Sequence, residues 1–185
     1  SEELREISWA DFKVNGTPLS DGTTISSEML ASYTGSLNNT VFEGDVKIPA
    51  GAGFRYGTAI GHFGLTLKVN SSGQFVVSGV NAFKVNGTTD EYTFNAGDYG
   101  VEGGTFNNKR FTLKIEMYDM DEAKDNAKVK IYINGQQAGT EFTLSNEFPD
   151  PNSEYYPRFK IESNIGFGAG GLGTGVTVWD ARTAA

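Results

Sequence analysis

The stretch RFTLKIEMYDMDEAKDNAKVKIYING, residues 110–135, decides the fold of this chain. Apolar and polar side chains alternate over residues 110–118, and this period of two predicts a half-buried β-strand. Residues 128–133 repeat the alternation and end at Asn134-Gly135, a dipeptide typical of a tight hairpin turn. We therefore predict two antiparallel strands, with a loop over residues 119–127 between them.

The register of these two strands follows if every apolar side chain lies on one face of the sheet. When Met117 faces Val129, Glu116 lies opposite Lys130 on the other face. Ile115 and Ile131 are then expected to face each other in the core. The opposite, polar face is expected to consist of Lys114, Glu116, Tyr118, Lys130 and Tyr132.

Similar short strands are expected along nearly the whole chain. The other expected strands are residues 7–14, 40–48, 54–60, 64–69, 74–80, 91–94, 141–144, 158–162 and 175–181. Turn signals such as Asn15-Gly16 separate most of them, and only residues 26–31 are expected to form a helical turn. Many short strands without crossover helices predict an all-β fold. We expect a two-sheet antiparallel β-sandwich of jelly-roll type that forms a single domain over residues 1–185.

The composition excludes several kinds of chemistry. The chain has no Cys and a single His, His62, which rules out Cys-ligated metals, thiolate catalysts and sites that need two imidazoles. Fifteen Lys and Arg against 23 Asp and Glu give a net charge of −8 without a basic run, which argues against nucleic acid or an anionic membrane as a partner. No apolar run is long enough to span a membrane. No signal peptide opens the sequence, so any export signal is expected to have been removed.

The hairpin, with its acidic loop and the V-x-x-Y-x-N-G pattern at residues 129–135, resembles paired strands of concanavalin A-like lectin/glucanase and laminin-G-like sandwiches. Residues 7–16 and 175–182 are similar to the terminal strands that lie side by side in that superfamily. The resemblance covers nearly the whole chain and implies a jelly-roll fold and glycan binding. It also implies the structural calcium that such sandwiches often carry. We assign no metal ligand and no other cofactor.

Enzymes of the laminarinase type in this superfamily place acidic residues at alternate positions of one strand. Retaining hydrolysis needs two carboxyl groups about 5 to 5.5 Å apart, as residues i and i+2 of a strand provide. Glu116 and Asp119 are three positions apart and point to opposite faces if the strand continues, while Asp121 and Glu122 fall in the expected loop. The loop also lacks the ligand spacing of an EF-hand. We therefore predict no catalytic residues and no metal site here.

Sugar recognition combines aromatic rings, which stack on the apolar face of a pyranose, with planar polar side chains that bind hydroxyl groups. The polar hairpin face offers both types. Trp179, on the expected last strand, adds a second aromatic candidate, with Trp9 as its expected neighbour. Each ring also has a purely structural interpretation, because exposed tyrosines pack across strands and tryptophans are usually partly buried. The predicted ligand-binding residues are Lys114, Glu116, Tyr118, Lys130, Tyr132 and Trp179.

The lectin-like resemblance, together with the missing catalytic set, favours a non-catalytic carbohydrate-binding module that binds polysaccharide. We expect it to belong to a larger protein, with other domains, that is secreted and associated with the cell surface. Two alternatives stay open. One is a structural or adhesive spacer that contacts protein, and the other is a glycosidase or lyase on the same fold.

Overall fold

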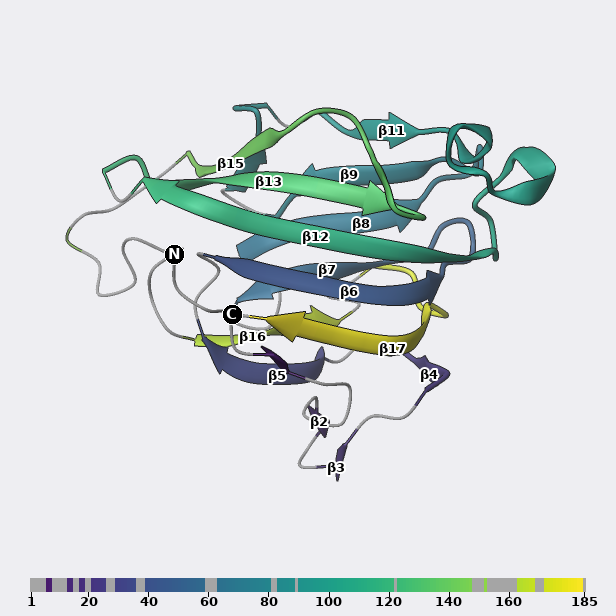
Figure 1. Cartoon of the computed structure of the whole chain (residues 1–185), viewed down its shortest axis with the longest axis horizontal. Coiled ribbons are helices and arrows are strands. Elements are labelled where there is room, and N and C mark those ends of the chain that lie inside the picture. The colour runs from purple at the N-terminus through teal and green to yellow at the C-terminus, as the bar shows by residue number, and fades with distance from the viewer. Residues whose placement is uncertain are drawn as a thin grey trace.

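Two antiparallel β-sheets pack face to face in the structure, which is a computed structural model of the chain (Figure 1). We call them the front sheet, which includes β6, β12 and β13, and the back sheet, which includes β7, β8 and β9. The structure describes residues 6–7, 13–14, 17–18, 21–25, 29–35, 39–58, 63–80, 83–88, 90–121, 123–147, 152, 163–168 and 172–184.

The front sheet carries the hairpin predicted from the sequence. Its strands, in spatial order, are β1 (Glu6–Ile7), β17 (Thr177–Ala184), β6 (Thr40–Lys47), β12 (Arg110–Asp121), β13 (Asn126–Ile133), β15 (Phe142–Asn146) and β10 (Phe83–Val85). Two further strands pair at its side, β14 (Gln136–Gln137) with β13 and β4 (Thr23–Thr24) with β17. The central strands β6, β12 and β13 therefore form an extended and well-paired surface.

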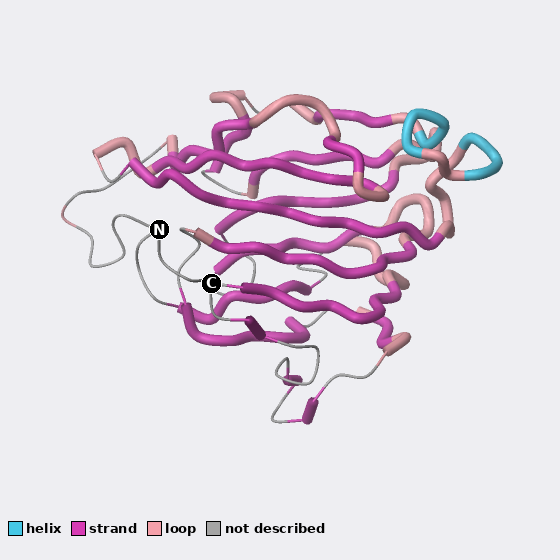
Figure 2. Tube along the Cα trace, viewed as in Figure 1, coloured by secondary structure: helices cyan, strands magenta, loops and turns pink. Residues whose placement is uncertain are grey.

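The back sheet lies behind the front sheet in the view of Figure 1. Its order is β11 (Tyr92–Phe94), β9 (Phe75–Gly79), β8 (Phe63–Val69), β7 (Gly53–Thr58), β16 (Ser163–Gly168) and β5 (Met29–Gly35). A separate hairpin joins β2 (Lys13–Val14) to β3 (Thr17–Pro18). Two short 3₁₀ helices, η2 (Ala96–Tyr99) and η3 (Glu102–Gly104), lie at one end of the sandwich and are cyan in Figure 2.

The chain passes repeatedly from one sheet to the other, which is the mark of a jelly roll. It leaves the front sheet after β6, builds β7 to β9 in the back sheet, and returns for β10 and again for β12 to β15. Strands that are neighbours in space therefore come from distant parts of the sequence. The terminal strands β1 and β17 pair, with Glu6 opposite Ala184, as expected. The predicted two-sheet antiparallel sandwich is confirmed.

The core between the sheets follows from the alternating pattern. On β6 and β13 every second residue is buried, and Ile115 and Ile131 lie opposite each other with fully buried side chains. An aromatic cluster fills one part of the core, where the Phe75 and Phe111 rings meet edge-on with centroids 5.5 Å apart. The predicted hairpin register is confirmed, with Met117 opposite Val129. Burial of such a side chain contributes roughly 1.5 to 3 kcal/mol.

The hairpin tip differs from the expectation. Strand β12 continues to Asp121 and β13 begins at Asn126, so the predicted loop over residues 119–127 was too long. The pairing register shifts between Tyr118 and Asp121, and Asp119 has a φ of 52°. This β-bulge explains the error, because a bulge interrupts the alternation while the strand goes on.

Two other segments also differ from the sequence-based expectation. A helical turn was expected over residues 26–31, but residues 29–31 belong to strand β5, which begins at Met29. Strand β16 (Ser163–Gly168) was not expected, because its glycines give a turn-like sequence. The strand expected at residues 158–162 lies outside the described residues, as do residues 8–12 of the first expected strand.

Candidate functional site

The outward-facing side of the front sheet, here called the outer face, contains the predicted hairpin residues. On β12 and β13 the buried residues alternate with partly exposed ones, so one set of side chains enters the core and the other faces away from it. All five predicted hairpin residues belong to the second set and are half-buried: Lys114, Glu116, Tyr118, Lys130 and Tyr132. The sequence-based assignment of faces is therefore correct.

The two tyrosines of this face each lie beside a lysine. Lys114 Nζ lies 5.4 Å from the centroid of the Tyr132 ring, and Lys130 Nζ lies 5.5 Å from that of Tyr118. Lys114 also forms an ion pair with Glu116, with Nζ and Oε1 3.2 Å apart. We call these five residues the tyrosine platform. Because they stand on paired strands, the rings are presented with little backbone freedom.

Tyr118 has a further partner that the sequence did not reveal. Its hydroxyl donates a hydrogen bond to Glu141 Oε2, just before β15. Burial of the hydroxyl raises the pKa of Tyr118 well above its ordinary value, and the hydrogen bond and negative charge of Glu141 raise it further. The phenol therefore stays protonated and serves as a hydrogen-bond donor at neutral pH. Sequence alternation placed residues 141–144 in a strand but gave no sign that this strand pairs with β13.

Trp179 also faces outward on the front sheet. It lies on β17, which is separated from β13 by β6 and β12. It pairs with Asp45 of β6, which in turn pairs with Thr112 of β12. The guanidinium carbon of Arg110 lies 4.3 Å from the centroid of the Trp179 ring, and Lys47 Nζ lies 5.9 Å from it. We call Trp179, Arg110, Lys47, Asp45 and Thr112 the Trp179 cluster.

Asp45 holds this cluster together. Its Oδ2 accepts a hydrogen bond of 2.9 Å from Arg110 Nε, and its Oδ1 accepts one of 2.7 Å from Thr112 Oγ1. Asp45 thereby fixes the position of the guanidinium over the tryptophan. Sequence analysis missed Asp45, Lys47 and Arg110 as site residues. Their outward positions follow from alternation, but their proximity to Trp179 depends on the strand order β17-β6-β12.

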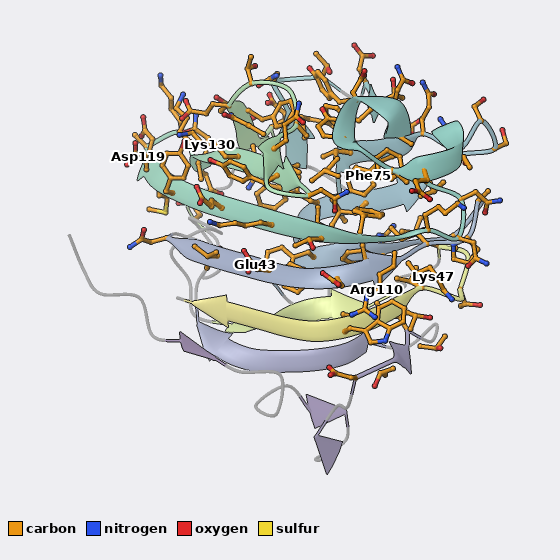
Figure 3. All side chains as sticks on the ribbon, turned by 45° about the vertical axis from the view of Figure 1, so that its right-hand side comes forward. Glu43, Lys47, Phe75, Arg110, Asp119 and Lys130 are labelled. Atoms are coloured by element: carbon orange, nitrogen blue, oxygen red, sulfur yellow. The ribbon has the colours of Figure 1, made fainter. Side chains whose placement is uncertain are left out.

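The two groups lie toward opposite ends of one surface. In Figure 3, Lys47 and Arg110 lie toward one end of the sheet, Lys130 and Asp119 toward the other, and Glu43 between them. Strands β17 and β13, which carry Trp179 and Tyr132, are separated by β6 and β12. At about 4.8 Å between neighbouring strands, three steps span roughly 14 Å. Trp179 and Tyr132 therefore lie on strands that are roughly 14 Å apart across the outer face.

The acidic residues of the hairpin tip are used to shape the turn. Asp121 Oδ1 accepts hydrogen bonds from the backbone N–H groups of Ala123 (3.0 Å) and Lys124 (3.2 Å). Asp125 is buried, and its Oδ2 accepts a hydrogen bond of 3.0 Å from Asn146 Nδ2. In the part of the chain that the structure describes, no three His, Cys, Asp or Glu side chains are grouped to hold a metal ion. Glu122 lies outside that part.

Some aromatic and titratable side chains cannot be placed. Trp9, His62, Tyr155 and Tyr156 lie outside the described residues, so the expected proximity of Trp9 to Trp179 stays a prediction. Among the described residues, no helix has the length and apolarity needed to cross a membrane.

Comparison with known proteins gives structural likenesses only. No protein-family model and no curated protein matches the sequence. Similar solved structures include the tail fiber protein gp63.1 of an E. coli phage, with 10% identity over 99% of this chain and 21% of that chain and a TM-score of 0.44. They also include the Caenorhabditis elegans galectin LEC-6 (12% identity, 86% of this chain, 94% of that chain, TM-score 0.43). A third is alginate lyase vAL-1 from Chlorella virus (10% identity, 96% of this chain, 88% of that chain, TM-score 0.41).

This chain therefore spans about a fifth of the length of the tail fiber protein. At such low identities, a likeness concerns the arrangement of strands and not the site. The concanavalin A-like resemblance noted in the sequence stays a prediction at the level of the superfamily, whereas the β-sandwich itself is established by the strand pairing.

Proposed function

We propose that this chain is a non-catalytic carbohydrate-binding module that holds polysaccharide on the outer face of its front sheet. The observation that carries the proposal is the presence of Tyr118, Tyr132 and Trp179 on one face, each with a cationic side chain against its ring. Aromatic rings next to charged hydrogen-bonding groups are the combination that binds both the apolar and the hydroxyl-bearing parts of a sugar.

The way the rings are held supports binding rather than packing alone. Tyr132 is half-buried on a regularly paired strand, and the side chain against its ring is that of Lys114. Such an exposed cation–π contact contributes only about 0.5 to 1 kcal/mol, so a ligand can displace the lysine at low cost. Trp179 is also half-buried, and the guanidinium of Arg110 beside it is held by Asp45. The strands meanwhile keep the backbone ordered before the ligand arrives, which reduces the entropy lost on binding.

The acidic residues support a non-catalytic role. Glu116 is ion-paired with Lys114, and Asp121 accepts two backbone hydrogen bonds at the hairpin tip. A retaining glycosidase needs one carboxyl group to be a free nucleophile and another to be a proton donor. Of the four carboxylates considered from the sequence for such a pair, Glu116 and Asp121 have these structural partners instead. The secreted, cell-surface location and the larger parent protein expected from the sequence stay predictions.

Affinity electrophoresis through gels that contain soluble neutral and acidic polysaccharides tests the proposal. We expect the wild-type chain to be retarded by at least one of them, and Tyr132→Ala to weaken the retention by about tenfold, equivalent to about 1.4 kcal/mol. Tyr132→Phe is the matched control, because it keeps the ring and should keep most of the retention. The melting temperatures of both variants should stay close to that of the wild type.

Other outcomes identify the alternatives. Full retention of both Tyr132→Ala and Trp179→Ala would place the binding site elsewhere on the molecule. A wild-type chain that no polysaccharide retards would favour the structural or adhesive spacer. Release of reducing sugar, or of unsaturated ends from acidic polysaccharides, would show an enzyme on the same fold.

A further inference from the structure

Two cationic side chains face each other directly on the outer face. Lys47 of β6 and Arg110 of β12 occupy paired positions, and both approach the ring of Trp179. Like charges directly opposite each other on a sheet are destabilising. Asp45 pairs with Arg110, while no carboxylate of the described residues lies within ion-pair distance of Lys47. One positive charge of the Trp179 cluster is thus left without a counter-charge there.

Arg110 is held in a way that leaves its outer edge available. Its Nε donates to Asp45 and its guanidinium carbon lies over the Trp179 ring, while 53% of its side-chain surface is exposed. Among the described residues, its two terminal nitrogens have no hydrogen-bond acceptor. Those two nitrogens form the fork that binds a carboxylate in a bidentate manner, and the guanidinium is already oriented before any ligand arrives.

The central part of the outer face is positive although the chain is negative. Over β6, β12 as far as Tyr118, and β13, the outward charged side chains comprise five basic and three acidic residues, whereas the hairpin tip beyond Tyr118 is acidic, with Asp119 exposed and Glu141 bonded to Tyr118. The basic ones are Lys47, Arg110, Lys114, Lys128 and Lys130, and the acidic ones are Glu43, Asp45 and Glu116. The whole chain has a net charge of −8. A local positive surface on a negative protein attracts anions to that surface and repels them elsewhere.

We infer that the ligand of this face is an acidic polysaccharide, and that a sugar carboxylate binds to Arg110 and Lys47 while the rest of the chain extends over the tyrosine platform. This inference rests on the proposed function and specifies its substrate class. A carboxylate between Arg110 and Lys47 removes the repulsion between these two cations. The spacing between the Trp179 cluster and Tyr132 favours a polymer, which contacts both groups at once, over a single sugar acid.

The test compares polymers that differ only in charge. The probes are polygalacturonate, alginate and hyaluronan, each beside its carboxyl-reduced form, with dextran sulfate as a sulfated polyanion. We expect at least one polyuronate to be bound about tenfold or more tightly than its reduced form, with affinity falling as salt screens the charges. Dextran sulfate tests for attraction by charge alone; it should bind more weakly, because its sulfate groups do not occupy the position that the carboxylate has on a uronate ring.

The variants locate the charge effect on the molecule. Arg110→Gln should weaken polyuronate binding by about tenfold. The affinity of Arg110→Lys should lie between those of Arg110→Gln and the wild type, because lysine keeps the positive charge but lacks the two terminal nitrogens of arginine. Lys47→Gln should weaken it less. Lys68→Gln is the matched control: it makes the same charge change on the back sheet, where Lys68 pairs with Glu91. It should leave binding unchanged.

Several results would overturn the inference. They are equal binding of a polyuronate and its reduced form, an Arg110→Gln effect no larger than that of Lys68→Gln, and tightest binding to dextran sulfate. Retention by a neutral polysaccharide alone, lost in Tyr132→Ala and kept in Arg110→Gln, would also overturn it while leaving the proposed function intact. Binding of no polysaccharide at all would overturn the proposed function itself.

Discussion

The guanidinium of Arg110 covers the ring of Trp179 at 4.3 Å, although the strands that carry these residues are not neighbours. Strand β6 lies between them, and its Asp45 pairs with Trp179 in the sheet and binds Arg110 Nε. The contact therefore exists only because three strands from distant parts of the chain are adjacent. It joins the tryptophan to the same surface as the tyrosine platform.

Removal of the Trp179 ring should weaken binding and lower stability only moderately. Trp179→Ala is expected to weaken polysaccharide binding by about tenfold and to lower the free energy of unfolding by about 1 to 2 kcal/mol, because the ring is half-exposed and its cation contacts are weak. Affinity electrophoresis and urea unfolding measure the two effects. A loss of stability above about 3 kcal/mol, typical of buried aromatic truncations, with unchanged affinity would assign the ring to packing alone.

The core pair Ile115 and Ile131 should behave in the opposite way. Each Ile→Ala variant is expected to destabilise the fold by roughly 2 to 5 kcal/mol, because it leaves a cavity opposite a fully buried neighbour. Lys128→Ala, on the outer face of the same hairpin, is the control and should change stability by no more than about 0.5 kcal/mol. Urea denaturation measures all three. Near-wild-type stability of both isoleucine variants would mean that the hairpin faces are inverted.

Gly79 at the end of β9 should not tolerate a methyl group. A Cβ at this position would overlap the backbone oxygen of Phe83, so the chain would have to move. We expect Gly79→Ala to destabilise by about 1 to 3 kcal/mol, the range for overpacking. Gly97→Ala is the control, because a Cβ there meets no atom within 4 Å. Equal melting temperatures of the two variants would contradict the close approach.

The bond between Tyr118 and Glu141 should be visible in an alkaline titration. The raised pKa means that folded protein keeps the phenol proton more tightly than the unfolded chain. This contribution to stability is therefore present below the ordinary phenol pKa of about 10 and is lost as pH rises through the folded value. Glu141→Gln should lower the pKa of Tyr118, because the negative charge is removed while burial remains.

Ultraviolet absorbance of ionised tyrosine measures this titration. Tyr118→Phe identifies the signal, since it should remove one late-titrating tyrosine from the wild-type curve. Tyr99 serves as an internal reference, because its pKa is raised mainly by burial and should not respond to Glu141→Gln. An unchanged late component in both Tyr118→Phe and Glu141→Gln would contradict the hydrogen bond.

Local patterns predicted the hairpin well. Alternation was sufficient to place Met117 opposite Val129, because a shift by one residue would turn the apolar side chains of one strand to the other face. The same alternation correctly placed the tyrosine platform on the outer face. In the turn that joins β13 to β14, Asn134 and Gly135 both have positive φ, 50° and 80°, as these two residue types readily permit.

The rest of the candidate site depends on contacts that alternation does not encode. Nothing in the sequence around Trp179 indicates that it lies beside Asp45, because strand order in a jelly roll is set by how the whole core closes. The bond from Tyr118 to Glu141 likewise depends on β15 pairing with β13. The β-bulge after Tyr118 was missed because one extra residue leaves no periodic signal.

The most direct test of the central claim, that the outer face binds polysaccharide, is an NMR titration of isotope-labelled protein with an oligosaccharide from the polymer that retards it most. We expect the backbone amides of β6, β12, β13 and β17 and the indole N–H of Trp179 to shift, while the amides of β8 and β9 in the back sheet stay in place. Shifts confined to the back sheet, with the Trp179 and Tyr132 signals unmoved at saturation, would contradict the account.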